Sequence, residues 1–166
     1  MKNTHIVYGF VTALAIIIVN LVLYVTGNAF NSWAQYVGYV PFLIGLILNA
    51  NAFSKANEEG VTFGKLFASC YKACAIITLV VLAWSYIAFA IFPDMMDKGM
   101  EMARQKMSER GNISQEQMDQ GMEMTRKYFK VFMAMGIIFG YMFVGAIFSL
   151  IGAGLAKKKP TTTMPY

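Results

Sequence analysis

Apolar residues fall into four long runs along the chain, and polar residues collect between them. The runs cover residues 6–25, 33–53, 73–92 and 131–156. A helix needs about 20 predominantly apolar residues to cross the roughly 30 Å hydrocarbon layer of a bilayer. Each run is close to this length or longer, and none contains Asp, Glu, Lys or Arg. We therefore predict an all-α, polytopic membrane protein with four transmembrane helices in a single membrane domain.

Signals at the ends of these runs predict where the helices begin and end. Trp33 opens the second run, in keeping with the preference of tryptophan for membrane–water interfaces. Gly60 is expected to cap a prolonged second helix, and Thr62 to start the third. Pro93 should end or kink the third helix, because proline disfavours a helical residue before it. The tail, residues 157–166, has no periodic pattern and is predicted to be disordered.

Residues 93–130 separate the third and fourth runs and carry two amphipathic stripes with helical spacing. The first stripe is Met96, Met100, Ala103 and Met107, and the second is Met118, Met122, Thr125 and Phe129. Between the stripes, Gly111 and Asn112 indicate a turn, and Ser114 followed by Gln117 forms a capping box. We predict an extramembrane helical hairpin in which the third and fourth helices extend straight out as a methionine-zipped pair, reaching about 25 Å at about 1.5 Å per residue.

The composition agrees with a membrane protein and argues against an enzyme. Hydrophobic residues make up 57% of the chain and charged residues 14%, whereas soluble domains average about 45–50% and about 25%. Two cysteines and one histidine leave little material for a disulfide framework, acid–base catalysis or a zinc site. We expect no catalytic residue, no cofactor and no enzymatic activity.

The net charge of +5 is unevenly distributed. Residues 93–130 hold as many acidic as basic residues, so the excess lies near the ends of the apolar runs. The first run has Lys2 on one flank and no charge on the other, and residues 157–159 are three lysines after the last run. The positive-inside rule counts Lys and Arg alone and gives seven on each side, so the flanks of the first run and the lysine tail decide, and they predict cytoplasmic termini. Nucleic-acid binding is not expected, because most aromatic residues lie inside the apolar runs.

Small residues one helical turn apart recur in the first and fourth runs. Such pairs let two helix backbones approach closely. We predict that they pack helices within the bundle, with a dimer interface as the alternative. The pairs are Gly9 with Ala13, Gly136 with Gly140, and Ser149 with Ala153.

Methionine is concentrated in residues 93–130, which hold eight of the 13 in the chain. Thioether sulfur is a soft ligand that selects Cu(I), so these side chains are candidate metal ligands. The alternative is that flexible methionines fill an irregular seam or a surface that binds a partner. We favour packing and partner binding, because no His or Cys accompanies the methionines in this segment. The copper hypothesis rests on Met96, Met100, Met107, Met118 and Met122.

Several short segments resemble a known family. They are Tyr8-Gly9, residues 57–64 (NEEGVTFG), Phe92-Pro93-Asp94 and residues 149–153 (SLIGA). Through them the chain resembles the bacterial "domain of unknown function 4199" family over nearly its whole length. The resemblance implies a small protein of the bacterial inner membrane with no established activity. Members are often encoded near a polyprenyl-phosphate glycosyltransferase, which implies an accessory role.

The sequence therefore predicts a multi-pass inner-membrane protein without enzymatic activity. Its leading interpretation is an accessory or scaffold subunit whose helical hairpin contacts a protein partner or a second copy of the chain. A small oligomeric transporter or channel is the first alternative, and a methionine-rich copper-binding membrane protein is the second.

Overall fold

The computed structural model describes residues 3–57, 60–109 and 114–156, and every regular element within these ranges is a helix. This confirms the all-α prediction. The predicted turn at Gly111 and Asn112 and the predicted disordered tail lie outside the described residues. In chain order the helices are α1 (Thr4–Val25), α2 (Ala34–Val37), α3 (Tyr39–Ala56), α4 (Phe63–Ile91), α5 (Asp94–Ser108) and α6 (Gln115–Leu155).

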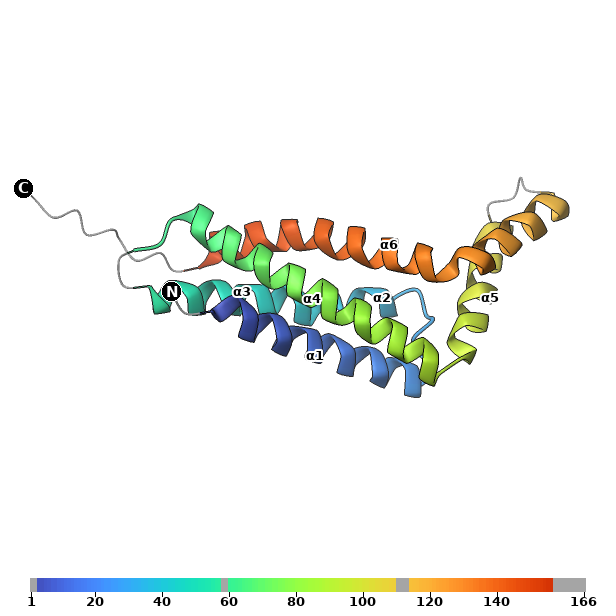
Figure 1. Cartoon of the computed structure of the whole chain (residues 1–166), viewed down its shortest axis with the longest axis horizontal. Coiled ribbons are helices and arrows are strands. Elements are labelled where there is room, and N and C mark those ends of the chain that lie inside the picture. Colours follow the sequence, from blue (N-terminus) through green and yellow to red (C-terminus); the bar gives the residue numbers. More distant parts are fainter. Residues whose placement is uncertain (1–2, 58–59, 110–113, 157–166) are drawn as a thin grey trace, which may run out of the picture.

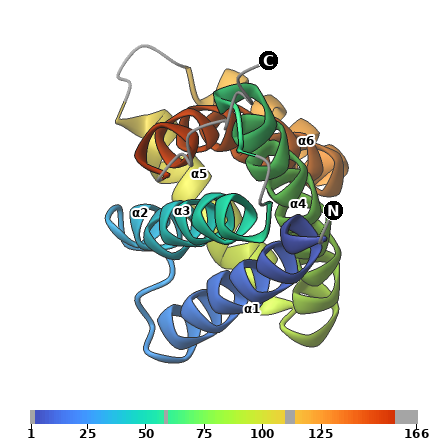
Figure 2. The same cartoon turned by 90° about the vertical axis from the view of Figure 1, so that its left-hand side faces the viewer.

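Four long helices pack side by side as a bundle, with α5 at one end (Figure 1). Viewed along the bundle, α3 lies between α1 and α6, and α4 lies beside all three (Figure 2). The buried core is mainly apolar, and α1, α3, α4 and α6 all contribute side chains to it. Its largest fully buried apolar members are Phe42, Ile16, Leu46, Leu66 and Ile77.

Within the described residues, three helices are long and apolar enough to cross a membrane, namely α1, α4 and α6. The structure therefore shows three candidate spans where the sequence predicts four. The second predicted span corresponds to α2 and most of α3. Asn49, Asn51 and Lys55 lower the hydropathy of α3 near its C-terminal end. Asn49 is fully buried and its amide donates to Ser69 Oγ at 3.2 Å.

The helix containing the third predicted span begins at Phe63, ten residues before the start of the apolar run. The helix can include charged residues in its first turns because Lys65 and Lys72 occupy exposed positions, which leaves the other side of α4 apolar. The side chain of Thr62 accepts from Lys65 N, which confirms this residue as the N-cap. Gly60 does not cap α3, which ends at Ala56. Instead Gly60 has φ +81° in the connection, a value that glycine tolerates without strain.

Pro93 separates α4 from α5, as its chemistry predicts. The expected straight extension of the third helix is corrected, because α5 turns steeply from the axis of α4 and runs across the end of the bundle (Figures 1 and 2). Phe92 leaves the helical conformation with φ −120° and ψ 77°, which sets the new direction. By contrast, α6 runs without interruption through both the hairpin and the fourth predicted span.

Candidate functional site

The hairpin formed by α5 and the first part of α6 is held together by the predicted stripes. All eight stripe residues are half-buried, and most residues between them are exposed. Gly121 leaves room for the methyl end of Met107, which lies 3.1 Å from the position that a Cβ at Gly121 would take. Ser114 and Gln117 form the predicted capping box at the start of α6. Local periodicity and capping therefore account for this hairpin.

Two ion pairs also connect the hairpin helices. Arg104 lies 3.5 Å from Asp119, and Arg126 lies 4.0 Å from Asp97. The four side chains are 62–76% exposed. Exposed ion pairs stabilise a fold by about 0–1 kcal/mol each, so packing of the stripes holds the hairpin more than these charges do. The charged groups of these pairs consequently remain exposed.

A groove of about 530 Å³ runs between the two hairpin helices. Two half-buried methionines, Met100 and Met122, provide its apolar part. The other lining residues are exposed and carry both signs of charge: Asp97, Glu101, Arg104, Glu123 and Arg126. An adaptable apolar strip flanked by mixed charges is the surface that an amphipathic helix of another protein fits.

A polar anchor joins the hairpin to the bundle. Tyr24 Oη, near the end of α1, donates to the two carboxylate oxygens of Asp94 at 2.7 and 2.9 Å. Lys98 Nζ lies 2.8 Å from the same carboxylate and 5.5 Å from the centre of the Tyr24 ring. Lys98, and then Tyr24, lower the pKa of Asp94 below its ordinary value, and Asp94 in turn raises the pKa of Lys98. The carboxylate therefore stays charged and holds the start of α5 against α1.

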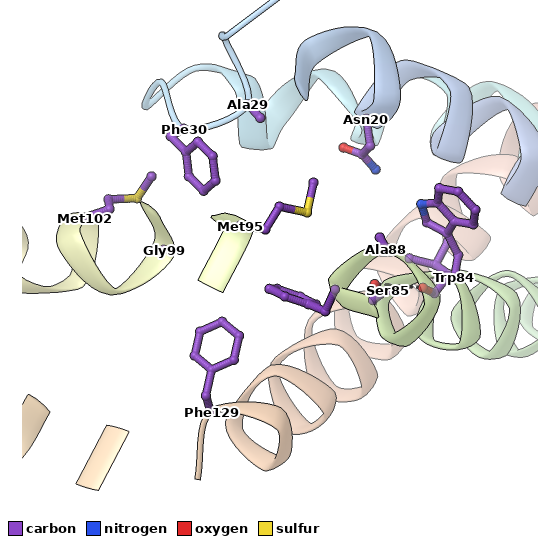
Figure 3. Close-up of a pocket in the computed structure, with 12 residues that line it drawn as sticks. Asn20, Ala29, Phe30, Trp84, Ser85, Ala88, Met95, Gly99, Met102 and Phe129 are labelled. Atoms are coloured by element: carbon purple, nitrogen blue, oxygen red, sulfur yellow. Dashed lines mark hydrogen bonds between the residues drawn. The ribbon is translucent and has the colours of Figure 1, made fainter. Parts of the chain in front are cut away.

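A second cavity, of about 350 Å³, lies where α5 crosses the end of the bundle (Figure 3). It is lined by α1, the connection after α1, α4, α5 and α6. The lining residues from α5 are Met95, Gly99 and Met102, a face of the helix that the two predicted stripes leave out. Their spacing of four and three residues is a helical signal that the sequence carried, yet it could not show what this face covers.

Residues 7–158 match the model described as "Protein of unknown function (DUF4199)". The chain belongs to this family. The match confirms the resemblance drawn from the short segments. No curated protein and no solved structure matches the chain.

The predicted small-residue pairs divide into two groups in the structure. A Cβ at Gly9 would lie 3.0 Å from Ile76 on α4, and Ala13 is fully buried. Ser149 and Ala153 are also fully buried. These four residues therefore face neighbouring helices.

For Gly136 and Gly140 the prediction of packing within the bundle is corrected, because a Cβ at either position would have no atom within 4 Å among the described residues outside its own helix backbone. The alternative of a dimer interface at these two residues stays a prediction. Gly145 is instead a glycine of α6 that packs closely against α4, because a Cβ there would collide with Cys74 Sγ. At about 100° per residue, Gly136 lies about 180° around α6 from Gly145. Spacing within one helix identified small residues but not the side that faces the bundle.

Both cysteines are buried in the bundle, and each thiol lies close to a backbone carbonyl. Cys70 Sγ donates to the carbonyl of Leu46, and Cys74 Sγ donates to that of Tyr141, each at 3.4 Å. They join α4 to α3 and to α6, respectively. Within the described part of the chain, no group of three or more His, Cys, Asp or Glu side chains could hold a metal ion.

Proposed function

We propose that this protein is a non-enzymatic membrane subunit whose α5–α6 hairpin binds an amphipathic helix of a partner membrane protein. The observation that carries the proposal is the groove between α5 and α6. It combines the half-buried Met100 and Met122 with exposed carboxylates and guanidinium groups. A helix with an apolar stripe and flanking charges of both signs would bury the methionines and pair with the charges.

A fourth span formed by α3 is part of this proposal. Its 18 residues measure about 27 Å along the axis, close to the roughly 30 Å of the hydrocarbon layer. The helix contacts α1, α4 and α6 along the bundle. Phe42, Leu46 and Ala50 are fully buried in these contacts, so α3 shares the same apolar environment as the three candidate spans. The amide nitrogen of its polar Asn49 donates to Ser69 of α4, whereas Asn49 Oδ1 is buried without a hydrogen-bond partner among the described residues.

In this proposal the termini lie on the cytoplasmic side of a bacterial inner membrane, and the hairpin lies outside. Lys65 and Lys72 of α4 lie at the same end of the bundle as the start of α1, where they line a pocket with Asn3 and His5. Basic residues at this end agree with the positive-inside rule. The hairpin lies at the opposite end (Figure 1).

Alkaline phosphatase fusions test the number of spans and the orientation together. Activity is expected for fusions at Asn31 and Asn112, and none at Lys65 and Pro160. Equal activity at Asn31 and Lys65 would show that α3 does not cross the membrane. A fully inverted pattern would keep four spans and reverse the orientation.

The partner is tested by exchanging the charges of one ion pair. Arg104→Asp places two carboxylates next to each other and breaks the ion pair with Asp119. Arg104→Asp combined with Asp119→Arg restores an ion pair but leaves a negative charge in the groove at position 104. We expect both variants to lose the protein that co-purifies in mild detergent. If the exchanged pair restores co-purification, these charges serve only the hairpin's stability. If the only protein that co-purifies is a second copy of the chain, the groove binds another copy in a homo-oligomer and not a different protein.

A further inference from the structure

The cavity at the junction between the bundle and α5 lies close to the ends of α1 and α4, two helices that are long and apolar enough to cross a membrane. Asn20 is five residues before the end of α1, and Trp84 is seven residues before the end of α4. At about 1.5 Å per residue, they lie roughly 7–10 Å from the ends of these helices. With these helix ends placed at the membrane surface, the cavity opens in the outer part of the lipid layer.

The cavity is apolar except at one end. Most of its surface is formed by aromatic, methionine and aliphatic side chains, including Phe30, Phe89 and Phe129. The twelve lining residues include no ionisable side chain, which disfavours a charged ligand inside the cavity. Its volume of about 350 Å³ falls within the range of about 300–1,000 Å³ that is typical of ligand sites.

Two hydrogen-bond donors stand at the polar end. The amide of Asn20 and the indole of Trp84 both line the cavity and appear toward the same end of it in the view of Figure 3. Among the described residues, neither Asn20 Nδ2 nor Trp84 Nε1 has a hydrogen-bond acceptor, whereas Ser85 Oγ donates to the carbonyl of Val81 at 2.8 Å. Asn20 is exposed and Trp84 is half-buried, so both donors can be reached from outside the cavity. Where lipid rather than water faces them, donors without a partner favour a ligand that brings an acceptor.

We propose that the cavity binds one acyl chain of a bilayer glycerolipid, with the chain's ester carbonyl at the polar end. The carbonyl oxygen accepts hydrogen bonds from Asn20 Nδ2 and Trp84 Nε1, and the chain lies along Phe89 and Phe129. From α5, Met95 and Met102 close over the chain, and their flexible side chains adapt to its shape. The site is independent of the groove, which lies on the other face of α5.

Native mass spectrometry of the full chain in detergent tests the site. The probes are phosphatidylglycerol with two ester-linked chains and its diether analogue, which lacks the carbonyls. We expect one diester lipid to remain bound at collision energies that remove the diether analogue. Asn20→Leu combined with Trp84→Phe should abolish this difference, whereas the matched control Asn51→Leu should keep it. Equal retention of both lipids by the native protein would overturn the proposal.

A cavity-filling variant provides a second test that leaves both donors in place. A Cβ at Gly99 would lie 3.8 Å from the Phe129 ring, an ordinary contact, so Gly99→Leu enters the cavity without a clash at that atom. Gly154→Leu is the control, because its Cβ would meet open space. With helical content unchanged, Gly99→Leu should lose the retained lipid and Gly154→Leu should keep it. Retention by both variants would show that the lipid lies elsewhere on the surface.

Discussion

Tyr24 and Asp94 are 70 residues apart in the chain and hydrogen-bonded in the fold, with 2.7 Å between Tyr24 Oη and the nearer carboxylate oxygen. The ring of Tyr24 also packs 4.8 Å from that of Phe92, centre to centre. Both contacts hold the break between α4 and α5 against the end of α1. The direction of α5, and with it the cavity and the groove, depends on this anchor.

Removing the Tyr24 hydroxyl should loosen α5 without unfolding the bundle. Tyr24→Phe keeps the ring contact with Phe92 and deletes the two hydrogen bonds to Asp94. Amide hydrogen exchange in Asp94–Ser108 should accelerate severalfold, while exchange in α1 and α3 stays unchanged. Tyr36→Phe is the matched control, because its side chain is exposed. Unchanged exchange in α5 would mean that packing alone positions the hairpin.

Acid should release the same anchor. The pKa of Asp94 lies below its ordinary value of 3.8 in the folded state, so its stabilising effect is complete above that pH. The effect is lost as the pH falls through the lowered pKa. Fluorescence of Trp84 in a Trp33→Phe background should shift in this acidic range, since Trp84 lines the cavity that α5 covers. Asp94→Asn should remove the pH step, and an identical step in both proteins would point to another group.

The contact of Gly145 with Cys74 predicts a specific pair of substitutions. Gly145→Ala forces its Cβ into Cys74 Sγ, and overpacking of this kind costs about 1–3 kcal/mol. Cys74→Ala should restore much of the loss, because the remaining neighbours lie 3.0 Å or more from that Cβ. Gly140→Ala has open space and should be neutral or slightly stabilising. Thermal unfolding in detergent compares the native protein with Gly145→Ala, Gly145→Ala plus Cys74→Ala, and Gly140→Ala. Equal losses of stability from Gly140→Ala and Gly145→Ala would contradict the packing of α6.

These glycines also show what the sequence could and could not predict. The capping box at Ser114, the N-cap at Thr62 and the break at Pro93 depend on neighbours within a few residues, so local chemistry predicts them. Which side of α6 faces the bundle depends on contacts with α3 and α4, which are distant in the chain. The same holds for the direction of α5. The predictions for Gly136 and for a straight hairpin failed for this reason, and the cavity could not be foreseen.

The hairpin methionines should be replaceable by leucine. Changing Met96, Met100, Met107, Met118 and Met122 to leucine keeps the volume roughly constant and removes every thioether of the copper hypothesis. Such exchanges usually cost less than about 1.5 kcal/mol each, so the fold and partner binding should survive. Tight, stoichiometric Cu(I) binding by the native protein that is lost in this variant would favour the copper alternative.

The groove as a partner-binding surface is the central claim, and site-specific photo-crosslinking in the native host tests it most directly. A photoreactive residue at Met122 lies in the groove, whereas one at Met124 lies about 200° around the helix, on a side chain that is 60% exposed. We predict one dominant adduct with a membrane protein from position 122 and none from position 124. The adduct should disappear when Arg104→Asp and Asp119→Arg are introduced together. No adduct at 122, or equal labelling at both positions, would contradict the claim.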